Sequence, residues 1–143
     1  MKISARNQFN GTISAVHDGA IYTEVSVQLK GGGTTIKAMI TKDSAEALGI
    51  KTGIQAIALV KAPQIMVVTD FGGYRISARN QLQGTITQLK EGAINTEVDI
   101  ALTGGEQLIA TVTNDSVEML ALQVGQTVTA VFKSSAVILA VAS

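Results

Sequence analysis

The segment Ser4-Ala5-Arg6-Asn7-Gln8 returns unchanged later in the chain as Ser77-Ala78-Arg79-Asn80-Gln81. A second match follows at the same offset, since Gly11-Thr12-Ile13 corresponds to Gly84-Thr85-Ile86. The offset shortens by one residue after the glycine run Gly31-Gly32-Gly33, where a hairpin turn tolerates a change in length. Repetition over nearly the whole chain indicates two copies of one structural unit, and this duplication decides the fold.

The two copies are predicted to form two small domains, residues 1–70 and 76–143, joined by a linker at residues 71–75. The stretch Asp70-Phe71-Gly72-Gly73-Tyr74-Arg75 contains a glycine pair that is typical of a linker. A linker of this length spans at most about 20 Å when it is extended, so the two domains are expected to lie side by side.

Apolar and polar residues mostly alternate within each copy, which is typical of half-buried strands. The pattern changes at residues 41–49, where a threonine, acidic residues, alanines and a leucine precede Gly49 and predict a short helix. Residues 114–120 are the matching helix of the second copy. We therefore predict a mainly β protein of two tandem OB-like five-stranded barrels, each with one short helix. The strands expected in the first copy are residues 12–16, 21–29, 34–40, 55–61 and 65–68.

The composition excludes several classes of protein. The 143 residues include no cysteine, which removes disulfides and thiolate metal sites. Eleven basic and eleven acidic residues balance, so the positive charge expected of a nucleic-acid binder is missing. We find no segment of membrane-spanning length and no signal peptide, and expect a cytoplasmic protein without a membrane partner. A hydrophobic fraction of 46% is high for small domains, so part of the apolar surface is expected to be buried in a homo-oligomer.

Three clusters of hydrogen-bond donors recur in both copies and contain no carboxylate. They lie in the repeated pentapeptide, at the helix start, and where the fourth strand turns toward the fifth. Free N–H groups at a helix start, hydroxyl groups and a lysine together suit a small tetrahedral dianion. Taken singly, a threonine and a serine at this position are ordinary helix caps. The candidate residues are Ser4, Arg6, Asn7, Thr41, Ser44, Lys61 and Ala62 in the first copy, and Ser77, Arg79, Asn80, Thr113, Ser116, Lys133 and Ser134 in the second.

No catalytic residue is predicted. His17 is the only histidine and is replaced by Lys90 in the second copy, so no serine–histidine–acid set can be built twice. Glu24 and Glu97 are isolated acids on predicted strands, which favours exposure to solvent or pairing with a basic residue. The chain has no cluster of metal-ligating residues, so we expect neither an enzyme, nor a cofactor, nor a bound metal cation.

An OB barrel can instead bind single-stranded nucleic acid. That use depends on aromatic side chains that stack on bases and on a basic groove. With three phenylalanines, two tyrosines and no tryptophan, the chain lacks such a platform, and we expect no nucleic-acid partner.

Three motifs in this order resemble the molbindin family, whose Mop domains also occur in molybdate-responsive regulators and transporter ATPases. They are the pentapeptide followed by Gly-Thr-Ile, the pair Thr41-x-x-Ser44, and Lys61-Ala62-Pro63. The resemblance covers both copies, and a tandem pair is similar to the di-Mop, or TOBE-type, subclass.

The resemblance implies a cytoplasmic, non-enzymatic protein that binds, stores and buffers molybdate, and tungstate as well. It also implies six Mop domains in one particle, which for a tandem chain is a homotrimer, with the anions held between neighbouring domains. The ligands that it implies are Ser4, Arg6, Thr41, Ser44, Lys61 and Ala62 with Ser77, Arg79, Thr113, Ser116, Lys133 and Ser134.

The second copy departs from the motif, because Lys133-Ser134-Ser135 stands in place of Lys61-Ala62-Pro63. Ser134 can add a hydroxyl that Ala62 lacks, so the sites built from the two copies need not be equivalent. Two other functions stay open at this point: an oxyanion-sensing regulatory or interaction module, and an OB-type oligonucleotide binder.

Overall fold

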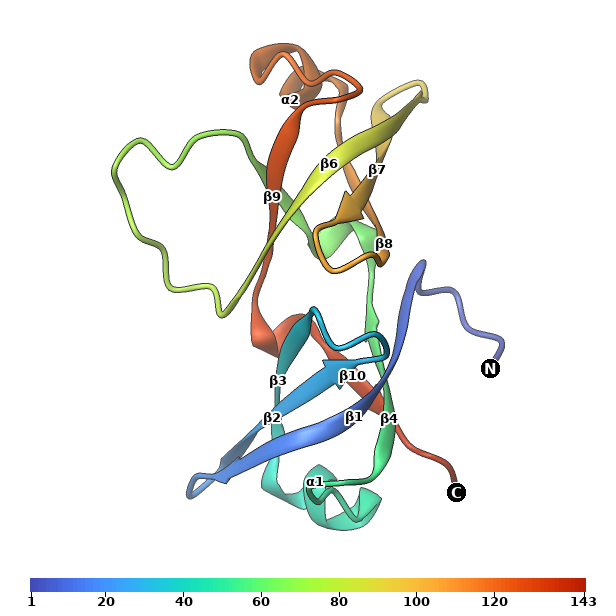
Figure 1. The fold of residues 1–143 in the computed structure, drawn as a ribbon, viewed down its shortest axis with the longest axis vertical. Helices are drawn as coiled ribbons and strands as arrows, with labels where there is room; N and C mark the ends of the chain where they lie inside the picture. The colour runs from blue at the N-terminus through green and yellow to red at the C-terminus, as the bar shows by residue number, and fades with distance from the viewer.

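The computed structural model describes all 143 residues as two five-stranded antiparallel sheets with one short α-helix each (Figure 1). This confirms the predicted mainly β fold of two OB-like barrels. The molecule is elongated, and helices α1 and α2 lie at its opposite ends. Neither α-helix has the length and apolar character that a membrane-spanning helix requires. The helices are α1 (Lys42–Leu48), α2 (Asn114–Met119) and the 3₁₀ turns η1 (Ala62–Gln64) and η2 (Ser134–Ala136); the strands are β1 (Asn7–Asp18), β2 (Tyr22–Leu29), β3 (Thr35–Thr41), β4 (Gln55–Val60), β5 (Met66–Val68), β6 (Asn80–Glu91), β7 (Asn95–Leu102), β8 (Gln107–Thr113), β9 (Thr127–Phe132) and β10 (Ile138–Ala140).

Each sheet takes its fifth strand from the other copy of the sequence. The strand order is β10-β4-β1-β2-β3 in the first sheet and β5-β9-β6-β7-β8 in the second. Ile138 of β10 pairs with Leu59 of β4, and Met66 of β5 pairs with Val131 of β9. The sequence predicts a turn at Ala62-Pro63, and the structure has η1 there. This 3₁₀ turn carries the chain into the other barrel instead of back along β4.

The stretch 71–75 lies in the long loop between β5 and β6, which both belong to the second sheet. Figure 1 shows this loop, green to yellow, extending to one side of that sheet. The N–H of Gly72 donates to the Asp70 carboxylate at 2.8 Å, and Gly72 and Gly73 adopt φ angles of 60° and 83°, which glycine reaches without strain. The chain therefore passes between the barrels at η1 and again at η2, while residues 71–75 lie in a loop between two strands of one barrel.

Strand β1 is longer than the predicted strand at residues 12–16 because its first half pairs with β4 and its second half with β2. Gly11 lies where the two pairings meet, and a Cβ atom there would come within 2.5 Å of the Gln28 carbonyl oxygen. Gly84 of β6 has the same surroundings, with the Ala101 carbonyl oxygen at 2.5 Å. This close backbone approach explains why the glycine of Gly-Thr-Ile occurs in both copies.

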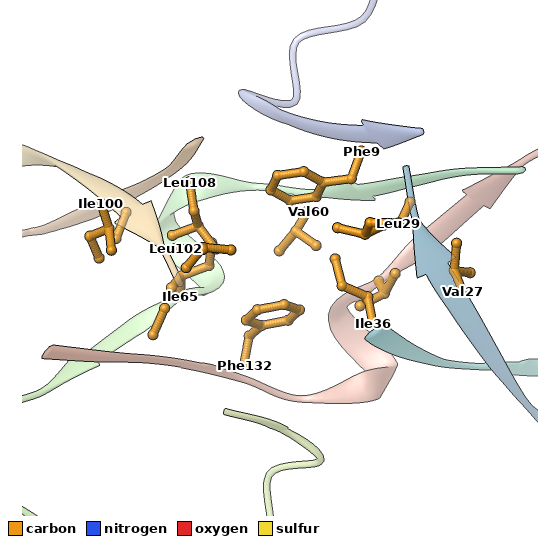
Figure 2. Packing of buried hydrophobic residues seen from close by; sticks show 14 of the residues in the cluster. Phe9, Val27, Leu29, Ile36, Val60, Ile65, Ile100, Leu102, Leu108 and Phe132 are labelled. Atoms are coloured by element: carbon orange, nitrogen blue, oxygen red, sulfur yellow. The ribbon is translucent and has the colours of Figure 1, made fainter. Parts of the chain in front are cut away.

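One hydrophobic core of 24 buried residues runs through both barrels. Figure 2 shows Phe9 and Phe132 on opposite sides of this core, with Val60 between them. The copies interchange large and smaller residues, because Phe9 corresponds to Leu82 and Val60 corresponds to Phe132. Such compensation keeps the core filled, and a shared core stabilises the two barrels as one unit.

Candidate functional site

The first hollow, as we name it, combines polar groups from both copies of the sequence. It is lined by Ser4 and Lys61 of the first copy, by Ser135 of the second, and by the apolar side chains of Ile3 and Ile138. Ser4 precedes β1 and Lys61 follows β4, so the pairing of these two strands brings the residues together. The other lining residues are Ala5, Leu59, Gln64 and Ala136, and none of the set is a carboxylate.

The second hollow is the counterpart formed around Ser77, Arg79, Lys133 and Ser134, with Met66 from the first copy. It likewise contains no carboxylate, and its other lining residues are Val68, Ile76 and Ala78. Ser134 supplies a hydroxyl where the first copy has Ala62, and Arg79 lines this hollow whereas Arg6 does not line the first. The two hollows are therefore similar in charge but not identical.

Backbone N–H groups add donors to both hollows. Those of Ser4, Ala5 and Lys61 have no hydrogen-bond acceptor in the chain, and the same holds for Ser77 and Lys133. An occupant made only of acceptor atoms would accept hydrogen bonds from these N–H groups.

Helix α1 begins with the predicted cap. Thr41 is extended, and its Oγ1 accepts a hydrogen bond from the Ser44 N–H at 3.1 Å. The same Thr41 hydroxyl donates to Ser44 Oγ at 2.8 Å, which leaves the Ser44 hydroxyl proton free for an outside acceptor. At α2 the Ser116 N–H donates to Thr113 Oγ1 at 3.1 Å, and the hydroxyl groups of Thr113 and Ser116 share a hydrogen bond of 2.8 Å in which either can be the donor.

Within one chain the helix starts lie far from the hollows. Strand β1 leaves the first hollow at Asn7 and reaches its far end after twelve residues, a path of roughly 35 Å when extended. Thr41 pairs with Tyr22, just beyond that far end, and Figure 1 places α1 and α2 at the two tips of the molecule. The structure therefore unites the pentapeptide with the lysine and separates both from Thr41 and Ser44.

The side chains of Asn7 and Asn80 join the two copies. The Asn7 amide donates to the carbonyl oxygens of Val60 at 3.2 Å and Ile109 at 2.8 Å, and accepts from the Ile109 N–H at 2.8 Å. Asn80 exchanges two hydrogen bonds of 2.8 Å with the backbone of Lys37 in the same way. Both asparagines are almost fully buried. Because their side-chain amides are hydrogen-bonded to backbone groups, these amides are not free to bind an anion.

The arginines of the pentapeptide also reach the other copy. Arg6 forms an ion pair of 2.7 Å with Glu97, and Arg79 forms one of 2.6 Å with Glu24. The expected pairing of the two glutamates with basic residues is thus present. These pairs are half-exposed, so each contributes at most about 1 kcal/mol to stability, and they orient the arginines more than they hold the barrels together.

The two copies differ in charge beside Glu97. Asp99 of β7 stands where the first copy has Ser26, and Ile109 stands opposite it where the first copy has Lys37. Burial raises the pKa of Asp99, and the negative charge of Glu97 raises it further. Burial also acts to raise the pKa of Glu97, but Lys90 and Arg6 outweigh that effect and lower it. One oxygen of Asp99 is buried without a hydrogen-bond partner.

The substitution Asp99→Ser, which copies the first repeat, is expected to raise the melting temperature at pH 7. Folding raises the pKa of the Asp99 carboxyl, so the ionised carboxylate present at pH 7 destabilises the folded state. The protonated carboxyl does not carry this penalty, so the stability that it confers is lost as the pH rises through the raised pKa. The gain should therefore shrink as the pH falls toward about 4, the usual pKa of aspartate. Melting curves between pH 3.5 and 7.5 would contradict the assignment if the gain were the same throughout.

Some residues of the hollows carry no signal in the sequence. Ser135 and Ile138 of the second copy line the first hollow because the fifth strands are exchanged. A larger surface groove, beside Lys30 and Met1, contains none of the predicted site residues. Its lining is mostly apolar or amide, so it offers an anion less than the two hollows do.

The fold and the paired hollows define a duplicated small binding domain, and comparison with known proteins identifies its class. The TOBE domain model matches residues 3–67 and 76–139, so the chain belongs to the TOBE domain family. It is 46% identical over 141 residues to the molybdenum transport protein ModE of Herbaspirillum seropedicae, which covers 99% of this chain and 52% of that protein. It is 39% identical over 140 residues to the DNA-binding transcriptional dual regulator ModE of Escherichia coli K12, covering 98% of this chain and 52% of the regulator. The chain thus spans about half the length of these curated relatives.

A solved structure matches the whole molecule. The cytoplasmic molybdate-binding protein ModG, crystallised with molybdate bound, superposes with a TM-score of 0.95 at 46% sequence identity. The match covers 99% of this chain and 100% of the ModG chain. The tandem arrangement is therefore shared with ModG from end to end.

Proposed function

We propose that this protein binds molybdate without catalysis, and that it stores and buffers the anion in the cytoplasm. The observation that carries the proposal is the pair of hollows, each lined by hydroxyl groups, a lysine and free backbone N–H groups and by no carboxylate. The likeness to ModG, a cytoplasmic molybdate-binding protein, supports both the ligand and the location.

A lining of donors alone favours some anions over others. Molybdate is fully deprotonated near neutral pH, whereas phosphate largely keeps a proton that requires an acceptor. A hollow without carboxylates leaves that proton unpaired, at a cost of about 1–3 kcal/mol. Tungstate has nearly the same size and charge as molybdate, so we propose that it binds as well.

We propose that the complete sites form between chains, in a homotrimer. The two hollows hold the pentapeptide and the lysine, while Thr41 and Ser44 point outward at the tips, so a neighbouring chain is needed to unite them. Exposed apolar side chains lie beside both parts, among them Ile21 at a tip and Ile138 at a hollow, with 69% and 59% of their surface exposed. Contacts between subunits would bury these side chains.

The proposed binding set follows from this arrangement. Asn7 and Asn80 remain in it only through their backbone, because their amides are occupied. The set otherwise comprises Ser4, Arg6, Thr41, Ser44, Lys61 and Ala62, with Ser77, Arg79, Thr113, Ser116, Lys133 and Ser134.

Calorimetric titration of the purified, folded protein with sodium molybdate tests the ligand. We expect saturable binding at micromolar concentrations, tungstate competing, and hydrogen phosphate failing to compete. If the folded protein gave no heat of binding with molybdate at these concentrations, the proposed function would be refuted.

Light scattering of the same sample tests the assembly. Three chains of 14.8 kDa each should give one particle of three times that mass. A monomer in the presence of saturating molybdate would show that one chain suffices for binding and would rule out the sites between chains.

A second function is an oxyanion-sensing module that transmits the presence of molybdate to a partner. The ModE relatives favour it, because one of them is a DNA-binding transcriptional regulator. Affinity capture with and without molybdate separates the two functions: a store should capture the same proteins under both conditions, whereas a sensor should gain or lose a partner.

A further inference from the structure

The fifth residue of the repeated pentapeptide makes the same local contact in both copies. Gln8 Nε2 donates to the carbonyl oxygen of Ala5 at 3.1 Å. Gln81 Nε2 donates to the carbonyl oxygen of Ala78 at 2.9 Å and, more weakly, to that of Ile76 at 3.4 Å. Each glutamine thus folds back onto the serine–alanine–arginine segment, of which Ser4 and Ala5 line the first hollow and Ser77, Ala78 and Arg79 line the second.

This contact has no evident part in holding the barrels together. Gln8 and Gln81 are exposed, and each makes its side-chain hydrogen bonds only to the segment that precedes it. Asn7, one residue earlier, is buried and bonded to the other copy. An exposed residue that is identical in both copies, and bonded only to the anion-facing segment, points to a role in that segment.

The bound carbonyl sets the direction of the neighbouring donor. A trans peptide group is planar, so its C=O and the following N–H point in opposite directions. Holding the Ala5 carbonyl toward Gln8 therefore holds the Arg6 N–H in the opposite direction. The hydrogen bond from Gln8 also engages the Ala5 carbonyl oxygen, whose negative partial charge would otherwise repel an anion. The Ala78 carbonyl and the Arg79 N–H are related in the same way.

We propose that Gln8 and Gln81 are positioning residues for anion binding. They fix the Ala5–Arg6 and Ala78–Arg79 peptide planes so that the Arg6 and Arg79 N–H groups are preorganised before the anion arrives. The proposal rests on the proposed function, because the anion is what the oriented donors would bind. Preorganisation strengthens binding because the free loop has less conformational entropy to lose.

The test uses the full chain with both glutamines replaced, Gln8→Met with Gln81→Met, since methionine keeps the length of the side chain and removes the donor. Gln28→Met is the control, because Gln28 also donates to a nearby backbone carbonyl, that of Gly32 at 2.6 Å, in a hairpin away from both hollows; its Oε1 accepts a further hydrogen bond from Thr35 at 3.1 Å. Molybdate affinity and stoichiometry are measured by calorimetry, stability by urea unfolding, and backbone order parameters of residues 4–6 and 77–79 by NMR without anion.

We expect the double variant to bind molybdate about 3- to 10-fold more weakly, the effect of losing a modest neutral hydrogen bond. Stoichiometry and urea midpoint should match the wild type, while order parameters of the two segments should fall toward the flexible range, below about 0.6. The control should leave affinity and these order parameters unchanged.

Two results would overturn the proposal while the wild type binds molybdate: a double variant as tight as Gln28→Met, or weaker binding with unchanged order parameters. A wild type that binds no molybdate refutes the proposed function instead, and the order parameters then still report whether the glutamines fix the segments.

Discussion

Replacing Asn7 with alanine is expected to lower the free energy of unfolding by about 2–4 kcal/mol. The substitution removes three hydrogen bonds and leaves the N–H and C=O groups of Ile109 without partners at the contact between the two copies. Both copies should lose stability together, because they share one core and Asn7 bonds the first to the second. Urea unfolding followed by far-UV circular dichroism measures the change.

Asn10→Ala is the matched control, because Asn10 lies three residues further along the same strand and is exposed. It should change the free energy of unfolding by less than about 0.5 kcal/mol, as is usual for surface substitutions. If Asn7→Ala cost no more than Asn10→Ala, the asparagine bridge would not be a stabilising contact between the copies.

The double substitution Lys61→Ala with Lys133→Ala is expected to weaken molybdate binding about 10- to 100-fold. Each lysine lines one hollow, and a hydrogen bond to a charged group contributes roughly 1.5–3 kcal/mol. Each single variant should weaken only the sites that its own hollow helps to form, which calorimetry would register as two classes of site.

Lys30→Ala provides the matched control, since it removes the same positive charge from a hairpin outside both hollows. It should leave the affinity within about twofold of the wild type if the effect is local and not a matter of net charge. Equal affinity and stoichiometry in the double lysine variant and in the control would exclude lysine as a ligand.

Much of the fold can be read from local patterns in the sequence. The alternation of apolar residues predicts the strands, and Thr41 with Gly49 marks the short helix, which the structure has at Lys42–Leu48. Strand β1 is underestimated because its first residues, from Asn7 to Asn10, are stabilised as a strand by β4 and not by their own propensity.

The candidate site is only partly predictable for a related reason. The repeated pentapeptide marks a functional segment, but its letters do not distinguish a residue that faces a ligand from one that faces the other copy. Asn7 and Asn80 are predicted from the sequence to be anion donors, but in the structure their side-chain amides are hydrogen-bonded to backbone groups of the other copy. Gln8 and Gln81 look like surface residues, and the structure bonds them to the segment beside each hollow.

The duplication, the barrel type and the donor-only chemistry follow from the sequence, because they depend on repeated motifs, on alternation and on composition. The exchange of the fifth strands was decided by the tertiary structure alone. Met66–Val68 and Ile138–Ala140 occupy equivalent places in the two copies, so either could pair with β4 or β9 without changing the local pattern. The choice depends on the course of the chain through η1 and on the shared core, and these are contacts between residues far apart in the sequence.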